Sequence, residues 1–270
     1  MKRIFILFFL FSCTTSRFQR KIQDPNMDAF KNESFQRWSD HRLNQLLISE
    51  NKGVPCYQGR SKDVLEQLKK DYFQNNRSSD FWLIIGNCFF MDENWNKSEF
   101  FYRLALEESK VAEIKSMALN NLALIQFRYN LWEEGREYLI QSISLKKDFK
   151  VPRFNLSQLY LQFGLYDDVI TLLENEEFGS IQDVDIFFTL GSAYFFKGEV
   201  VKAQTYFNKV APEEFLREDM ALTYALFLIN IGNPIEAKKL MKRRKHSDIP
   251  EISFISKKIE KLISEVLKED

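Results

Sequence analysis

The sequence predicts an all-α fold built from helical repeats, and three observations support this prediction. The chain of 270 residues contains only 9 Gly and 6 Pro, too few for an all-β protein, which needs turn residues roughly every 8–12 positions. Glycines recur 34 residues apart, at Gly164, Gly198 and Gly232. Around them, apolar residues follow at spacings of three and four, which is typical of helices with one buried face.

Composition and charge exclude several other classes of protein. Hydrophobic residues make up 45% of the chain and include 26 Phe and 10 Tyr, which is ample material for a core and argues against wholesale disorder. The 38 Lys and Arg balance 38 Asp and Glu. Because a chain with no net charge has no overall field to attract nucleic acid, we expect no nucleic-acid partner.

The first residues look like an export signal. Lys2 and Arg3 precede an apolar run over residues 4–11, far shorter than the roughly 20 residues of a membrane-spanning helix. The run ends in Leu-Phe-Ser-Cys, which resembles the lipobox of bacterial lipoproteins, although Phe11 is bulkier than usual. The resemblance implies a signal peptide over 1–12 and lipidation of Cys13. The alternatives are an ordinary secretory signal or a buried N-terminal helix.

The following residues agree with a lipid anchor. Residues 13–25 are mostly polar, carry several basic residues and are expected to form a tether. Thr14 stands where enteric lipoproteins retained in the inner membrane carry Asp. We therefore expect a chain in the bacterial cell envelope, attached to the lipid bilayer through acylated Cys13, in the outer membrane. Cys56 and Cys88 are then left to form a disulfide or to remain separate thiols.

The 34-residue register organises the rest of the chain. Four units in one register begin at Ser116, Lys150, Val184 and Glu218. A unit beginning at Ser79 is three residues out of phase with them, which predicts an insertion within 109–115. A degenerate unit begins at Gln45, within N-terminal helices expected over 26–78. A final helix over 252–270, with an apolar stripe and many Lys and Glu, is expected to cap the last repeat.

Each unit is predicted to form two helices joined by a tight turn. In the unit from Val184, Gly191 and Tyr194 belong to the first helix, Gly198 to the turn, and Ala203 and Phe207 to the second. This pattern resembles the tetratricopeptide repeat (TPR). The resemblance is strong over 79–251 and weak over 45–78. It implies a TPR-type α-solenoid of helix-turn-helix repeats with flanking helices.

The resemblance also implies a binding groove. In TPR proteins the first helices of successive repeats line a concave surface, and the matching offsets here are rich in Phe. The candidate peptide-binding residues are Asn87, Phe90, Asn120, Phe127, Arg128, Phe154, Gln158, Phe188 and Phe195. Exposed apolar rows of this kind mark interaction sites. The alternative is that superhelical curvature or the terminal helices bury part of the row. A clamp for a peptide carboxylate is disfavoured, because Leu83 and Val151 stand where basic residues are needed.

The chain offers little material for catalysis. His41 and His246 are its only histidines and lie far apart in the sequence, and no metal-ligand spacing or phosphate-binding loop occurs. We therefore expect no enzyme activity, no metal and no cofactor. A basic cluster over 238–245 could contact anionic lipid, a polyanion or an acidic protein, but such clusters are more often solvated helix faces.

These observations favour a membrane-anchored scaffold that binds a protein or peptide partner in the bacterial envelope. Assistance in assembling an envelope or pilus complex fits the same layout, although no motif singles it out. The alternative is a structural subunit of a multiprotein or homo-oligomeric assembly, whose groove is filled by its own chain or by a second copy.

Overall fold

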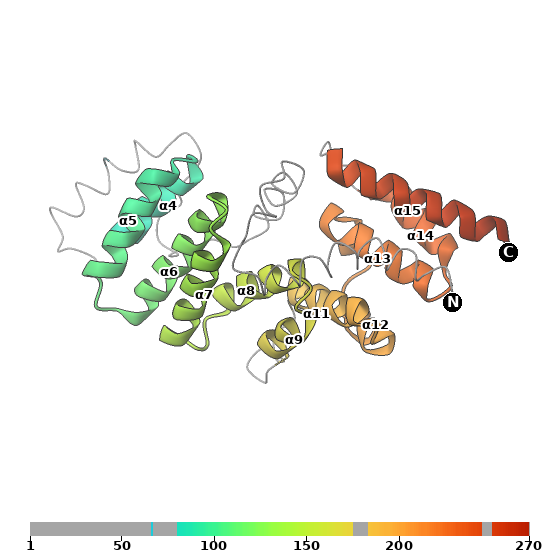
Figure 1. Cartoon of the computed structure of the whole chain (residues 1–270), viewed down its shortest axis with the longest axis horizontal. Coiled ribbons are helices and arrows are strands. Elements are labelled where there is room, and N and C mark those ends of the chain that lie inside the picture. Colours follow the sequence, from blue (N-terminus) through green and yellow to red (C-terminus); the bar gives the residue numbers. More distant parts are fainter. Residues whose placement is uncertain (1–65, 67–79, 175–182, 245–249, 270) are drawn as a thin grey trace. The chain divides into compact units, whose positions relative to one another are not determined.

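The computed structural model describes residues 66, 80–174, 183–244 and 250–269, and every regular element within these ranges is helical (Figure 1). The all-α prediction is therefore confirmed for the described part of the chain. Contacts divide it into two units between Leu159 and Tyr160. We call residues 80–159 the N-terminal unit and the described residues from 160 onward the C-terminal unit, and we describe each by itself. The signal peptide predicted over 1–12, the tether over 13–25 and, apart from residue 66, the N-terminal helices over 26–78 lie outside the described residues.

The N-terminal unit contains two complete helix pairs and most of a further helix. Its helices are α4 (Phe81–Met91), α5 (Trp95–Glu108), α6 (Ala112–Arg128), α7 (Trp132–Leu145) and the greater part of α8 (Lys150–Gln162). Helix α4 packs on α5 and α6 on α7, while α5 also contacts α6. Stacked pairs of this kind bury each helix's apolar stripe against its neighbours.

The C-terminal unit repeats the arrangement and ends in a long helix. Its elements are α9 (Tyr166–Leu173), α11 (Val184–Lys197), α12 (Val200–Phe207), the short 3₁₀ helix η2 (Glu214–Leu216), α13 (Glu218–Asn230), α14 (Pro234–Arg243) and α15 (Pro250–Glu269). Helices α11 and α13 pack on α12 and α14 respectively, and α15 runs beside α13 and α14 (Figure 1). Ile252, Ile259 and Ile263 of α15 are buried against that pair.

The turn inside each helix pair has one residue in the left-handed region of backbone space. Gly164, Gly198 and Gly232 have φ of 73°, 93° and 77°, while Asn130 and Glu93 occupy the same place with φ of 60° and 56°. The spacing is 34 residues from Asn130 onward and 37 between Glu93 and Asn130. The predicted three-residue offset between the first two repeats is therefore present in the backbone.

Small residues bring the two helices of a pair close together. Ser98 of α5 donates a hydrogen bond of 2.9 Å to the carbonyl oxygen of Gly86 in α4. In the next pair the hydroxyls of Ser116 and Ser142 lie 2.9 Å apart, each also donating to the other residue's carbonyl oxygen. These bonds satisfy the buried hydroxyls and fix the position along each helix at which the two helices cross.

Candidate protein-binding site

Asparagines on three successive first helices form a continuous hydrogen-bonded chain in the N-terminal unit. Asn155 of α8 donates to Oδ1 of Asn120 in α6 at 2.8 Å. Asn120 donates to Oδ1 of its neighbour Asn121 at 3.0 Å, and Asn121 donates to Oδ1 of Asn87 in α4 at 2.9 Å. The hydroxyl of Tyr102 also donates to Asn87, at 2.8 Å. We call these four asparagines the amide chain.

The amide chain joins three helices of one unit with groups that carry no charge. Asn120, Asn121 and Asn155 are completely buried, and Asn87 is 6% exposed. A carboxamide has two donor sites and two acceptor sites, so each side chain can bond to a neighbour on either side. The expectation that Asn87 and Asn120 face a groove is therefore wrong, because both side chains are buried and hydrogen-bonded to asparagines on neighbouring first helices.

Two of the predicted groove phenylalanines of the N-terminal unit are buried. Phe127 is 0% exposed and fills the space left by Gly135 on α7, where an added Cβ would lie 2.2 Å from its ring. Its ring also stacks on Trp132, with centroids 5.5 Å apart. Phe154 is 8% exposed. The expectation that these rings face solvent is therefore wrong. For Phe127 the reason is clear, because its ring packs between the two helices of its own repeat.

The predicted phenylalanines of the C-terminal unit are core residues as well. Phe188 is 8% exposed and lies against Phe207 and Phe215, at centroid distances of 5.6 and 6.3 Å. Phe195 is 5% exposed and meets Phe227 of α13 edge to face at 5.8 Å. Their expected exposure is wrong too, because Phe207 and Phe215 pack against Phe188, and Phe227 packs against Phe195.

Three of the nine candidates remain partly exposed, all of them in the N-terminal unit. Phe90 meets Trp95 edge to face at 5.0 Å. The guanidinium of Arg128 lies 5.1 Å from the centre of the same Trp95 ring, a cation–π arrangement. Gln158 lies on α8, one turn after Asn155 of the amide chain. These three side chains are the accessible ones among the nine candidates, and we call them together with the amide chain the first-helix face.

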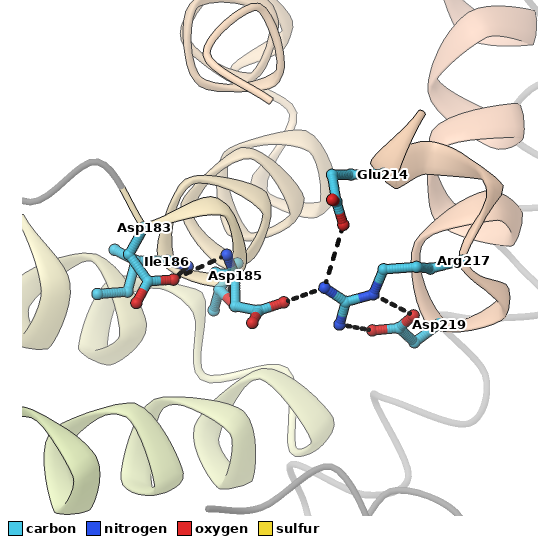
Figure 2. A network of polar contacts seen from close by, with 7 residues as sticks. Asp183, Asp185, Ile186, Glu214, Arg217 and Asp219 are labelled. Carbon is cyan, nitrogen blue, oxygen red and sulfur yellow. Dashed lines mark hydrogen bonds and ion pairs between the residues drawn. The ribbon is translucent and has the colours of Figure 1, made fainter. Parts of the chain in front are cut away.

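A polar cluster in the C-terminal unit was not predicted from the sequence (Figure 2). Arg217 contacts Asp185 at 2.9 Å and Glu214 at 3.5 Å, and it bonds to both carboxylate oxygens of Asp219. Asp183 caps α11 by accepting from the backbone N–H groups of Asp185 and Ile186. The cluster joins the start of α11 to the start of α13. Its members come from two repeats, so no spacing within one unit predicts it.

The cluster holds more carboxylates than cations. Burial raises the pKa of Asp185, while the neighbouring Arg217 acts in the opposite direction. Arg217 is partly exposed, and its own pKa is raised by Asp219 and Asp185 against the effect of burial. Water therefore screens these ion pairs. We interpret the cluster as a brace between repeats.

A second unpredicted contact connects α9, α11 and α12. The carboxylate of Glu174, directly after α9, accepts hydrogen bonds of 2.6 Å from the hydroxyls of both Tyr194 and Tyr206. The two rings are stacked, with centroids 5.6 Å apart. Burial and the bond to Glu174 raise the pKa of both tyrosines. Both phenols therefore stay protonated and continue to donate at neutral pH.

Several predicted features cannot be followed in the structure. Cys13, Cys56 and both histidines lie outside the described residues. Cys88 of α4 is disulfide-bonded. Within the described ranges no group of His, Cys, Asp or Glu could hold a metal ion, and no described helix is both long enough and apolar enough to cross a bilayer.

Comparison with known proteins shows the fold. No family model and no curated protein matches the chain. The solved structure of YrrB, described as a TPR protein with an unusual peptide-binding site, is similar over 72% of this chain and 97% of its own, at 13% identity with a TM-score of 0.53. The C-terminal part of a TPR repeat-containing protein from Cytophaga hutchinsonii matches over 77% of each chain, at 14% identity with a TM-score of 0.51.

The chain is thus similar to proteins of the TPR class, and the predicted TPR-type α-solenoid is confirmed. At these identities the likeness concerns the fold alone. Function has to be argued from the site, because one fold supports many activities.

Proposed function

We propose that this protein is a lipid-anchored scaffold that binds a protein or peptide partner in the bacterial cell envelope. The observation that carries the binding proposal is the first-helix face of the N-terminal unit. There the amide chain fixes three successive first helices, and Phe90, Arg128 and Gln158 remain partly exposed beside it. An aromatic ring, a guanidinium and an amide are suited to an extended or helical segment of a partner. Assistance in assembling an envelope or pilus complex is a finer form of the same proposal.

The anchor is proposed from the sequence alone. Cys13 ends an apolar run in a motif that resembles a lipobox. A disulfide on Cys88 agrees with export, because disulfides persist in oxidising compartments. Changing Cys13 to Ala should abolish incorporation of radiolabelled palmitate and release the protein from the membrane fraction. Unchanged labelling would refute the anchor while leaving the binding proposal intact.

A second candidate function is supported by burial. Asn120 and Asn121 are completely buried although they occupy first helices. This favours a structural subunit whose groove is filled by its own chain. The two candidates agree on the fold and differ in what touches the first-helix face.

Site-specific photo-crosslinking separates the two candidates. A photoreactive residue at position 128 or 158, in the full chain in its native membrane, should give one discrete adduct with another protein if the scaffold proposal holds. The same residue at the exposed positions 137 or 141 of α7 serves as control and should give none. Adducts that map to this chain itself, from both first-helix positions, would establish the structural subunit instead.

A further inference from the structure

Helix α15 presents two chemically distinct faces. Ile252, Ile259 and Ile263 are buried against α13 and α14. On the opposite side, Phe254 is followed by lysines three, four and seven positions later, a spacing that places all four side chains on one face of a helix. Those lysines are Lys257, Lys258 and Lys261, and all three are exposed. Phe254 is itself 59% exposed. We call these four residues the outer face of α15.

The adjoining helix adds further positive charge. On α14, the side chains of Lys238, Lys242 and Arg243 are exposed, and α14 packs beside α15 (Figure 1). Taken together, the exposed side chains described on these two helices comprise eight Lys and Arg against three Glu. Positive charge is therefore in excess among the exposed side chains described on α14 and α15, although the whole chain has no net charge.

The ion pairs within this region leave most of the charge available. Lys239 pairs with Glu236 at 2.6 Å, and Lys261 approaches Glu265 only to 3.8 Å. Arg244 is buried and belongs to the core: it donates to the Met241 carbonyl and the Ser256 hydroxyl and pairs with Glu260 at 3.3 Å. It holds α14 to α15, so the cationic face is built on a fixed support.

The exposed ring of Phe254 indicates the kind of surface that this face meets. The Lys258 ammonium lies 4.3 Å from its centroid, so ring and charge project together. On a protein partner, a protruding ring needs a matching pocket. The interface of an anionic bilayer accepts a ring at any position while its phosphates meet the lysines.

We propose that the outer face of α15, together with the exposed cations of α14, docks on an anionic phospholipid surface. The contact would hold the C-terminal end of the solenoid against the bilayer. This inference goes beyond partner binding by the first-helix face and does not require lipid on Cys13. Each Lys near an anionic surface contributes about fivefold to binding, so three lysines are sufficient for a measurable effect.

The test is vesicle flotation of the full chain with Cys13 changed to Ser, so that acylation plays no part. Vesicles contain phosphatidylethanolamine with phosphatidylglycerol, or phosphatidylcholine alone, at ~0.1 M salt, where charges are screened beyond about 10 Å. We expect binding to the anionic vesicles only. Changing Lys257, Lys258 and Lys261 together to Glu should weaken that binding about a hundredfold, because each of the three lysines contributes about fivefold.

A matched control changes three exposed lysines of the N-terminal unit, Lys110, Lys147 and Lys150, to Glu. It alters the net charge equally and should weaken binding less than about threefold, because these charges lie outside the proposed face. Circular dichroism checks that both variants keep their helices. In a separate variant, Phe254→Trp should gain fluorescence quenching by brominated phospholipid relative to its parent, which requires a folded and docked α15.

Three outcomes would overturn the proposal. The parent chain could fail to bind the anionic vesicles, the two triple variants could lose binding equally, or the Trp at position 254 could remain unquenched. Binding to soluble polyglutamate without binding to vesicles would assign the face to an acidic protein instead. None of these outcomes affects the crosslinking test of the first-helix face.

Discussion

The ring of Phe207 lies so close to Gly191 that a Cβ on that glycine would be 2.7 Å from the ring carbons Cδ1 and Cε1. Phe207 is 1% exposed and is surrounded by Phe188, Phe215 and Phe227. The same pairing of glycine with a buried ring occurs at Gly86 with Tyr102. The two helices of a repeat thus approach through a glycine on one and an aromatic ring on the other.

Changing Gly191 to Ala should destabilise the C-terminal unit. The new methyl group has no room, because the neighbours of Phe207 prevent its ring from moving away. The overpacking costs about 1–3 kcal/mol, against which Ala regains at most about 1 kcal/mol of helix propensity over Gly. Thermal unfolding followed by circular dichroism measures the effect. Gln204→Ala, an exposed change on α12, is the control and should stay within about 0.5 kcal/mol. Equal melting temperatures for the two variants would contradict the packing described here.

A substitution at the turn residue Glu93 should instead raise the stability of the protein. Its φ of 56° is unfavourable for a residue with a side chain, whereas Gly occupies the matching place in later repeats. Glu93→Gly should therefore raise stability by about 0.5–1 kcal/mol. Glu107→Gly, within α5, should lower stability by about 1 kcal/mol, since Gly is a poor helix former. A melting temperature that falls in both variants would refute the prediction.

The sequence predicts the fold well because the repeat fixes local structure. The recurrence of Gly164, Gly198 and Gly232 marks the turns, and these three residues have positive φ in the structure. The offset of the first repeat is likewise detectable, because Glu93 and Asn130 are three residues further apart than one repeat. Both features depend on residues close together in the chain, which is why a single sequence contains enough information.

The site was predicted less well, because exposure depends on the facing helix. Phe127 occupies a groove offset of the TPR pattern, yet its ring fills the space above Gly135. Gly135 on α7 was the sequence signal, because a glycine on the facing helix leaves space for a large ring to pack between the two helices. Arg217 gave no comparable signal, since its partners Asp185 and Asp219 begin two different helices.

Phe127 should consequently behave as a core residue. Phe127→Ala removes a completely buried ring and is expected to cost about 3–5 kcal/mol. Phe100 is 57% exposed, and Phe100→Ala should cost less than about 1 kcal/mol. Chemical denaturation of both variants measures the difference. If the two variants were equally stable, Phe127 would have to face solvent in the groove after all.

Replacing Arg217 with Met should weaken the brace in a pH-dependent way. At pH 7 we expect a loss of about 1 kcal/mol, a low value because the guanidinium is 36% exposed and its ion pairs are screened. Without Arg217 the pKa of Asp185, already raised by burial, rises further.

The sign of the pH effect follows from linkage. An acid whose pKa is higher in the folded state binds more protons there, so acidification stabilises the folded form. The deficit of the variant should therefore shrink as the pH falls from 7 toward the unfolded value of about 4. Urea denaturation across that range measures it, with Arg136→Met in an exposed ion pair of α7 as control. A deficit that grows on acidification would show that Arg217 does not restrain these carboxylates.

The amide chain makes a prediction about coupling. Asn120 and Asn155 share a hydrogen bond of 2.8 Å between α6 and α8, and both are completely buried. Changing either to Ala removes the hydrogen bond between them from a buried site, so the first substitution already incurs most of the cost of losing that bond. In a double-mutant cycle the two changes should be non-additive by about 0.5–3 kcal/mol. Asn87 and Asn155 lie at opposite ends of the amide chain, on α4 and α8, and should be additive within about 0.5 kcal/mol. Denaturation of the single and double variants gives both coupling energies. Additivity of Asn120 with Asn155 would mean that α6 and α8 are held together by their apolar contacts alone, and the amide chain would then lose its role in positioning the first-helix face.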